Sequence, residues 1–158
     1  MSPRAASRLE SLGFEDVYWY GPGKMDWVAF GLPVEGKLAT RLAGDTIRRD
    51  APTCSLVENV ADVRPRLGPA GWSQCVVTDE RNVVLGRVHR SDLDRDGETP
   101  IEQVMESGPS TYRPSVPLEE MLQAMKSGGH ETVLITRSDG VFLGLLNRQD
   151  AEERSRQK

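Results

Sequence analysis

The feature that most constrains this chain of 158 residues is an internal repeat. The segment CVVTDERNVVLGRVHRSDL, which begins at Cys75, aligns with VLITRSDGVFLGLLNRQDA, which begins at Val133, at an offset of 58 residues. The offset pairs Thr78 with Thr136, Gly86 with Gly144, Arg90 with Arg148 and Asp92 with Asp150. Because self-similarity at a fixed period is typical of repeated structural units, we expect residues 45–154 to form two copies of one unit.

Each copy also contains strands of its own. Pro52-Thr53 pairs with Pro109-Ser110 at an offset of 57, which predicts a slip of one residue within or beside the helix that follows. Brief strands are therefore expected at 52–56 and 109–113. Two further apolar strands follow in each copy, and the Ser-Asp-Gly at 138–140 is typical of a hairpin turn.

Helices are expected at three places in each copy. The first opens the copy, in GDTIRRD or in TPIEQVMES, where Thr99 can cap the helix and Pro100 can take its first position. The second, in PLEEMLQAMKSGG, places Leu118, Met121, Leu122 and Met125 on one face. Its counterpart ADVRPRLG is interrupted by Pro65. The last helix begins at Arg90 or Arg148.

This tandem β-α-β-β-α unit resembles a pair of cystathionine-β-synthase (CBS) domains. The resemblance lies in VVTDERNVVLGRVHRSDL and VLITRSDGVFLGLLNRQD, each of which ends in Gly-x5-Asp, and it covers about two thirds of the chain. It implies an α+β fold in which two repeats form a pseudo-twofold pair with their sheets packed together. We expect the repeats to span 41–97 and 98–158, after an extension over residues 1–40.

The resemblance also implies a regulatory role, in which the cleft between the repeats binds an adenosine-containing metabolite such as AMP, ADP, ATP or S-adenosylmethionine. Asp92 and Asp150 begin the last helices, where a carboxylate can accept hydrogen bonds from ribose hydroxyls. The family often has hydroxyl residues three positions and one position before this Asp. Those positions hold His89 and Ser91 in the first copy and Asn147 and Gln149 in the second.

Ser91 alone keeps a hydroxyl at these positions, so we expect a ligand to depend on Asp92 more than on Asp150. His89, when protonated, could pair with a phosphate. The strand-entry pairs Thr53-Cys54 and Ser110-Thr111 would lie near the base in the family fold. The alternative is that both aspartates only cap helices and that the strand-entry pairs are ordinary strand residues.

The N-terminal segment differs in composition from the repeats. It holds six of the nine aromatic residues: Phe14, Tyr18, Trp19, Tyr20, Trp27 and Phe30. Residues 5–12 predict a short helix, 17–20 a buried strand, and GKMDWVAFG a helix ending at Gly31. Some 40 residues cannot bury this much aromatic surface alone, so we expect Tyr18, Trp19 and Trp27 to pack on the repeats or on a partner subunit.

The stretch GFEDVYWYGPGKMDWVAFGLPVEG resembles the C-terminal end of a rhodanese-like domain. The nucleophilic cysteine of that family would lie upstream, and nothing before Ala5 can supply it. A sulfurtransferase is therefore a weak alternative. Cys75 and Arg81 match a Cys-x5-Arg phosphatase or rhodanese loop in form, but the residues after Cys75 continue a strand and include no glycine for an anion cradle.

Composition excludes several other classes. The net charge is −4, with 24 acidic and 20 dispersed basic residues, which argues against nucleic acid or anionic lipid as the main partner. No stretch approaches the roughly 18 apolar residues of a membrane span, and we expect a cytosolic protein. Two cysteines exclude a disulfide framework, and their spacing from His89 and His130 offers no local zinc motif.

Together these features predict a non-enzymatic sensor with no metal and no certain cofactor, whose ligand is an adenine nucleotide or S-adenosylmethionine. The alternative is a structural or protein-interaction module with empty clefts. We also expect a homodimer through the repeats, because the helices near residues 60 and 117 should expose Val63, Leu118 and Met121.

Overall fold

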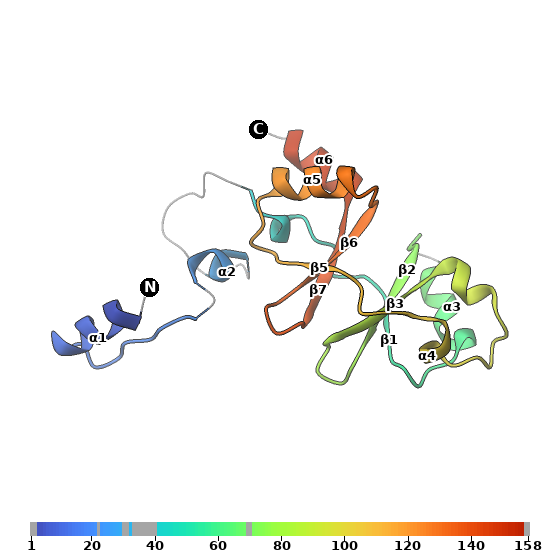
Figure 1. Ribbon diagram of the computed structural model, residues 1–158, viewed down its shortest axis with the longest axis horizontal. Coiled ribbons are helices and arrows are strands. Elements are labelled where there is room, and N and C mark those ends of the chain that lie inside the picture. Colours follow the sequence, from blue (N-terminus) through green and yellow to red (C-terminus); the bar gives the residue numbers. More distant parts are fainter. Residues whose placement is uncertain (1–2, 22, 30–31, 33–40, 69–70, 157–158) are drawn as a thin grey trace.

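The computed structural model describes residues 3–21, 23–29, 32, 41–68 and 71–156 (Figure 1). The strands are Thr53–Cys54 (β1), Gln74–Thr78 (β2), Val84–His89 (β3), Glu106–Ser107 (β4), Thr111–Tyr112 (β5), Thr132–Thr136 (β6) and Phe142–Asn147 (β7). They form one sheet of order β1-β2-β3-β4 and another of order β5-β6-β7. In each sheet the first strand is parallel to the second, and an antiparallel hairpin follows.

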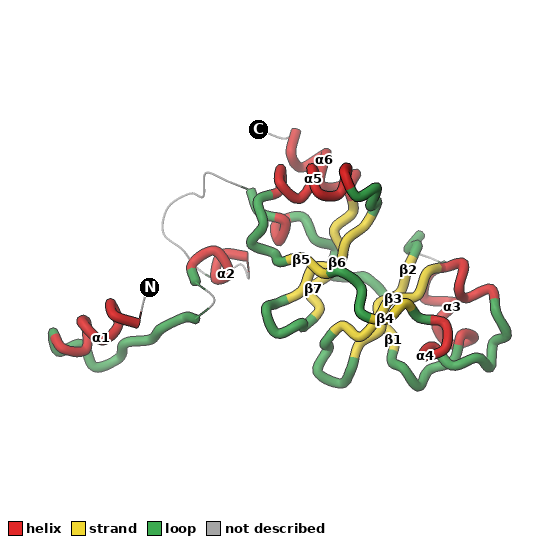
Figure 2. The backbone as a smooth tube through the Cα atoms, viewed as in Figure 1, coloured by secondary structure: helices red, strands yellow, loops and turns green. Residues whose placement is uncertain are grey.

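Helices flank these sheets, whose strands lie together in the middle of the repeat region (Figure 2). The helices are Pro3–Ser11 (α1), Lys24–Ala29 (α2), Val60–Leu67 (α3), Ile101–Val104 (α4), Leu118–Ser127 (α5) and Arg148–Arg156 (α6). Two 3-10 turns, Ala43–Asp45 (η1) and Arg90–Asp94 (η2), take the places of two predicted helices. The predicted α+β fold class is confirmed.

Each copy has its own hydrophobic core. In the second copy, α5 buries the predicted face of Leu118, Met121, Leu122 and Met125 against β6 and β7. In the first, α3 buries Val60, Val63 and Leu67. The expectation that Val63, Leu118 and Met121 are exposed is therefore wrong, because the sheet of the same copy covers them. The argument for a dimer that rested on their exposure is lost.

The segment that opens each copy packs on the other copy. Ile101 and Val104 of α4 belong to the first core, whereas Ala43 of η1 belongs to the second. The backbone N–H of Ile101 donates to the carbonyl of Glu58, and at an offset of 58 the N–H of Ala43 donates to the carbonyl of Val116, both at 2.9 Å. The hydrogen bonds thus repeat with the sequence, as a pseudo-twofold pair requires.

Strand register corrects the predicted slip. Thr53 pairs with Val76 in the first sheet, and Thr111 pairs with Leu134 in the second. The offset of 58 therefore holds through the short strands as well, and Thr53 is equivalent to Thr111 rather than to Ser110. The Pro-Thr and Pro-Ser dipeptides are similar in letters but do not occupy equivalent positions.

The helix α3 also departs from its prediction, because it continues through Pro65. Hydrogen bonds from the flanking side chains tie it to the rest of the copy: Arg64 donates to the carbonyl of Leu93 at 2.6 and 2.9 Å, and Arg66 donates to the carbonyl of Thr53 at 2.8 Å. These tertiary contacts outweigh the cost of a proline within a helix. At α4, Pro100 is the residue before the helix rather than its first residue, and Thr99 makes no cap.

The glycine of the repeat signature has a steric role. Gly144 has φ of 152°, and a Cβ atom on it would lie 2.5 Å from the carbonyl oxygen of Arg48. Gly86, its equivalent, would place a Cβ atom 2.7 Å from Sδ of Met105 and 2.9 Å from the carbonyl oxygen of Glu106. In each copy the segment that crosses from the other copy presses on this glycine, which explains why a side chain is excluded there.

The N-terminal segment lies apart from the sheets, with α1 at the far end of the molecule (Figure 1). The predicted strand at 17–20 is wrong: these residues are irregular, and Tyr18 and Trp19 are 83% and 54% exposed. Packing of these two side chains on the repeats of their own chain is likewise contradicted. Trp27 is half-buried beside Tyr20, with ring centroids 5.3 Å apart. The predicted helix end at Gly31 lies outside the described residues.

Candidate functional site

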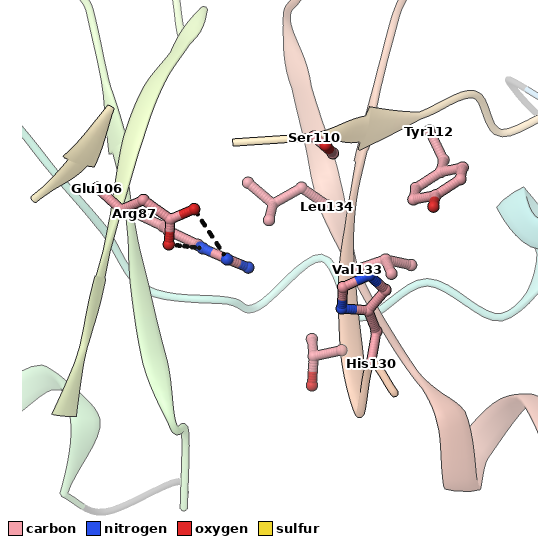
Figure 3. A pocket seen from close by; sticks show the side chains of 8 residues that line it. Arg87, Glu106, Ser110, Tyr112, His130, Val133 and Leu134 are labelled. Atoms are coloured by element: carbon pink, nitrogen blue, oxygen red, sulfur yellow. Dashed lines mark hydrogen bonds and ion pairs between the residues drawn. The ribbon is translucent and has the colours of Figure 1, made fainter. Parts of the chain in front are cut away.

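A pocket of about 230 Å³ lies between the two sheets (Figure 3), and we call it the second cleft. Both copies contribute to its wall, as a pseudo-twofold pair would require. Arg87 and Glu106 come from the first sheet and face the strands of the second sheet across the pocket. The remaining wall is formed by Ser110, Tyr112, His130, Thr132, Val133 and Leu134.

An ion pair occupies the first-sheet side of this cleft. Nε of Arg87 donates to Oε2 of Glu106 at 2.8 Å, and Nη2 donates to Oε1 at 3.0 Å. This bidentate geometry is the strongest form of such a pair. Nε2 of His89 lies 3.7 Å from Oε2 of the same carboxylate. The hydrogen bonds from Arg87, aided by the nearby imidazole, hold the pKa of Glu106 below its ordinary value.

Strand alternation places these side chains. Val88 is fully buried in the first core, so Arg87 and His89 point from the other face of β3. Arg87 and Glu106 are directly opposed in the antiparallel pairing of β3 with β4. The pair therefore follows from the register between these two strands, which the close approach at Gly86 permits.

The second-sheet side of the cleft is rich in hydroxyl groups. Ser110 precedes β5, Tyr112 ends it, and Thr132 and Leu134 lie two positions apart on β6, where Leu134 also belongs to the first core. The wall thus combines hydroxyl donors and acceptors with an aromatic ring and an apolar side chain. Such a surface suits a ligand that has both a flat ring and hydroxyl groups.

The predicted residues of the second copy fall in and around this wall. Ser110 lines the cleft, and Thr111 is its half-buried neighbour on β5. Asn147 lies opposite Thr132 in the β6–β7 pairing, and its Oδ1 accepts a hydrogen bond from the N–H of Gln149 at 2.8 Å. Asp150 is half-buried in the first turn of α6 and is not part of the cleft wall.

The predicted residues of the first copy are more dispersed. Oδ2 of Asp92 accepts a hydrogen bond from the N–H of His89 at 3.0 Å, so this carboxylate caps η2. Ser91 is exposed, Cys54 is buried, and Thr53 lies on β1. His89 approaches the second cleft through its contact with Glu106.

The equivalent place in the first copy, which we call the first cleft, holds different side chains. At an offset of 58, Glu106 corresponds to Arg48, His130 to Trp72 and Thr132 to Gln74. The guanidinium carbon of Arg48 lies 4.1 Å from the ring centroid of Trp72, which is only 7% exposed. Gln74 is buried, and its Nε2 has no hydrogen-bond partner. An indole and a guanidinium therefore stack where the second cleft has an imidazole and a carboxylate.

Several wall residues are absent from the predicted set: Arg87, Glu106, Tyr112, His130 and Thr132. Period-two alternation along Val84–His89 could have indicated that Arg87 and His89 share a face. Glu106 required the β3–β4 register, and no local pattern encodes that register.

The cysteines do not form a catalytic site. Cys54 and Cys75 lie on adjacent strands and are both buried. A hydrogen bond from one thiol to the other, together with burial, raises the pKa of the Cys75 thiol well above its ordinary value. Cys75 is thus neither exposed nor a thiolate, as a phosphatase or rhodanese nucleophile must be.

The described residues form neither a metal cluster nor a membrane-spanning helix. Among the residues that the structure describes, no three His, Cys, Asp or Glu side chains gather as metal ligands would. Within the same residues no helix combines the length and the apolar character needed to cross a membrane.

Known structures resemble this arrangement closely enough to identify its fold. The CBS domains of a transcriptional regulator from Streptococcus pneumoniae match with a TM-score of 0.66 and 23% identity, over 74% of this chain and 99% of theirs. The chain has the fold of a CBS-domain pair. CBSX2 in complex with AMP matches with a TM-score of 0.65 and 19% identity, over 73% of this chain and 96% of its own.

The cytosolic domain of the Mg²⁺ channel MgtE in complex with ATP also matches, with a TM-score of 0.66 and 18% identity. The match covers 72% of this chain and 48% of the MgtE chain, so this chain spans about half the length of that relative. Searches with family models and with curated protein sequences give no match. The resemblance of the N-terminal segment to a rhodanese tail stays a prediction.

Proposed function

We propose that this protein is a regulatory module that binds an adenosine-containing metabolite in the second cleft. The observation that carries the proposal is the wall of that cleft, which joins strands of both copies and presents hydroxyls, an aromatic ring and a paired guanidinium. A ligand held there contacts both copies at once. Its binding energy can therefore bias their relative arrangement, which is what a sensor requires.

Two of the structural relatives support the choice of ligand class, since one is a complex with AMP and another a complex with ATP. The pocket of about 230 Å³ is smaller than the roughly 300–1,000 Å³ of typical ligand sites. We therefore propose that it encloses the nucleoside part of the ligand and leaves the remainder toward solvent. Asp150 belongs to the same copy as most of the wall, whereas the sequence favours Asp92 for the ribose; comparison of Asp92→Ala with Asp150→Ala in the titration decides between them.

The candidate ligands differ in the charge that they would bring to the Arg87–Glu106 pair. Glu106 already occupies the guanidinium of Arg87, so a phosphate must displace this carboxylate to reach the cation. A cationic group such as the sulfonium or amino group of S-adenosylmethionine gains from Glu106 instead. In the Glu106→Gln variant, AMP should bind about fivefold more tightly and S-adenosylmethionine about fivefold more weakly.

The proposal is tested by calorimetric titration with AMP, ADP, ATP, S-adenosylmethionine and NADH. Ser110→Trp fills the cleft from an exposed position and should weaken the bound ligand by about tenfold or more. Ser107→Trp is the matched control, because Ser107 is also exposed but does not line the cleft, and it should leave the dissociation constant unchanged. Unchanged binding in Ser110→Trp, or no binding of any of the five ligands, would refute the proposal.

The stacking of Arg48 on the buried Trp72 at the first cleft favours a second candidate, a structural or protein-interaction module that needs no ligand. Trp72 and Arg48 pack on each other at the position equivalent to the ligand wall of the second copy. In this second candidate neither cleft binds a ligand, and both serve only to hold the two copies together. The titration distinguishes the two candidates, because an interaction module binds none of the five ligands. A non-enzymatic role, a cytosolic location and dimerisation through the repeats also stay predictions, and a thiosulfate–cyanide assay tests the sulfurtransferase alternative.

A further inference from the structure

Both histidines of the chain lie at the second cleft, although they belong to different copies. His130 lines the pocket from the second copy, and Figure 3 shows its ring on the side that faces the guanidinium of Arg87. Nε2 of His89, from the first copy, lies 3.7 Å from Oε2 of Glu106. Histidine is the side chain that ordinarily changes its charge between about pH 5 and 8. The charge of this cleft therefore depends on pH in the physiological range.

The equivalent positions at the first cleft do not titrate. At the offset of 58, His130 corresponds to Trp72 and His89 corresponds to Asn147. An indole and a carboxamide keep the same charge at every physiological pH. The sequence thus departs from its own repeat at both positions, and both departures supply an imidazole to the same cleft.

The Arg87–Glu106 pair supplies the other charges of the cleft, and these charges are constant in this range. A guanidinium stays protonated in proteins. Its hydrogen bonds, together with the nearby imidazole, hold the pKa of Glu106 below its ordinary value. Tyr112 on β5 also lines the pocket, and a phenol carries no charge between about pH 5 and 8. The pair contributes one positive and one negative charge, so protonation of both imidazoles changes the net charge of the cleft from zero to two positive charges.

The remaining charged groups near the two imidazoles are engaged by other partners. On η2, the carboxylate of Asp92 accepts a hydrogen bond from the backbone N–H of His89 at 3.0 Å. The charged neighbours of His130 in the sequence form ion pairs elsewhere: Glu131 with Arg148, and Lys126 with Glu152. The imidazole of His130 itself rests on the backbone of Gly128, where an added Cβ atom would lie 2.7 Å from Nε2. Its position beside the pocket is therefore set by the chain.

Protonation of His89 changes what a phosphate must displace. While the imidazole is neutral, an oxyanion that binds Arg87 leaves the carboxylate of Glu106 without a cation. Once the imidazole is protonated, this carboxylate can turn to His89, which already lies beside it, and the guanidinium is released toward the cleft with both of its donors. The protonated ring of His130 then adds a second cation in the wall of the pocket.

We propose that protonation of His89 and His130 decides the charge of the ligand that the second cleft accepts. The cleft binds an oxyanion, such as a nucleotide phosphate, below about pH 6, and it favours a cationic group, such as a sulfonium, above about pH 7. This inference rests on the proposed function, because it takes the second cleft as the ligand site. Proton uptake and anion binding are then linked, and each strengthens the other by the same factor.

Proton nuclear magnetic resonance of the full chain tests the anion site without a nucleoside. The chain has two histidines, so two imidazole C–H signals report their titration, and His89→Gln assigns them. Sulfate is the probe, because its charge is constant over this range. Sulfate at tens of millimolar should raise the titration midpoint of both signals by about 0.5 of a pH unit relative to chloride of equal ionic strength. Absence of this rise in either signal would overturn the inference.

Calorimetric titration at about pH 5.5 and 7.5 tests the choice of ligand. The reference is the double variant His89→Gln with His130→Gln, which retains the titration of the ligand's own phosphate near pH 6. Relative to this variant, the wild type should gain about tenfold in affinity for AMP on acidification and lose about fivefold for S-adenosylmethionine. Lys126→Gln is the matched control, because it removes a cation four positions before His130 that does not line the pocket, and it should keep the wild-type pH dependence.

The outcomes separate this inference from the proposed function. Equal pH dependence in the wild type and the double variant would overturn the inference even if AMP binds. If no adenosine-containing ligand binds at either pH, the proposed function is refuted, and the sulfate titration alone decides the inference. Circular dichroism at both pH values checks that each variant stays folded.

Discussion

The two clefts share a backbone and differ in their side chains. A pocket lies at the second cleft, whereas at the first cleft, 58 residues earlier, Arg48 stacks on the nearly buried Trp72. His130 and Glu106 in the second correspond to Trp72 and Arg48 in the first. A buried indole with a guanidinium stacked on it replaces an exposed imidazole and a carboxylate. One copy thus buries the aromatic side chain at this position, whereas the other leaves its imidazole exposed.

The largest expected effect distinguishes the clefts by stability. Trp72→Ala should lower the free energy of unfolding by about 3–5 kcal/mol, because it removes a nearly buried indole and leaves a cavity. His130→Ala, the equivalent change in the second copy, should stay within about 0.5 kcal/mol of the wild type, because His130 is exposed. Urea denaturation measures both. Equal losses in the two variants would show that the clefts do not differ as described.

Substitution of the two glycines of the repeat signature should give the next largest loss of stability. Gly144→Ala is expected to cost about 2–4 kcal/mol, because its Cβ would meet the backbone carbonyl of Arg48 at 2.5 Å and its φ of 152° disfavours a side chain. Gly86→Ala should cost about 1–3 kcal/mol, since the nearest atom belongs to the flexible side chain of Met105. Thermal unfolding compares the two variants. A larger loss of stability in Gly86→Ala than in Gly144→Ala would contradict this ranking.

A smaller effect separates the two helix-start aspartates. Asp92→Ala should destabilise the protein by about 1 kcal/mol, because its carboxylate accepts the hydrogen bond from the N–H of His89. Asp150→Ala should cost less, since in the second copy the cap is made by Asn147. Denaturant titration at neutral pH measures the difference. If Asp150→Ala were the more damaging change, the capping roles assigned to the two copies would be wrong.

The smallest effect depends on pH. The folded-state pKa of Glu106 is depressed by Arg87, so the pair stabilises the fold above the unfolded-state pKa of about 4.3, and this stability is lost as the pH falls through the folded-state value. Glu106→Gln should therefore cost about 0.5–1 kcal/mol at pH 7, a value kept low by solvent screening of this half-exposed carboxylate, and almost nothing at pH 3.

Arg48→Gln provides the contrast for that measurement. The indole does not titrate, so the loss of its stacking with Arg48 should not depend on pH, and only the small part of the cost that comes from the exposed ion pair of Arg48 with Asp50 should differ between pH 7 and pH 3. Denaturation curves of both variants at the two pH values give the comparison. A pH-independent cost for Glu106→Gln would mean that the ion pair does not act through the charge of its carboxylate.

The repeat was the strongest signal in the sequence, and it led to the α+β class and to the CBS-pair fold. Two apolar strands, a turn and a glycine form a local pattern, and the same pattern occurs twice at one offset. The apolar face of α5 was also readable, because its four buried residues follow helical spacing. The predicted slip at Pro52 was wrong, because Pro52-Thr53 and Pro109-Ser110 are similar in sequence but do not occupy equivalent positions in the strand register.

The candidate site was predicted only in part. Ser110 lies in the wall of the second cleft, but the preference for the first copy rested on the single hydroxyl of Ser91, which is exposed and does not line that wall. Sequence comparison within the chain could have shown that Trp72 stands where the second copy has His130. It could not show that Arg48 reaches across to stack on Trp72, because that contact joins different segments.

The sequence by itself determined the repeated unit, its apolar strands and the helix faces that pack on them, because hydrophobic periodicity is a local property. Tertiary structure decided the rest: the crossing of each opening segment to the other copy, the β3–β4 register that joins Arg87 to Glu106, the continuation of α3 through Pro65 and the exposure of the N-terminal aromatic side chains. These features depend on contacts between residues distant in the chain, and their energies outweigh the local preferences of the residues involved.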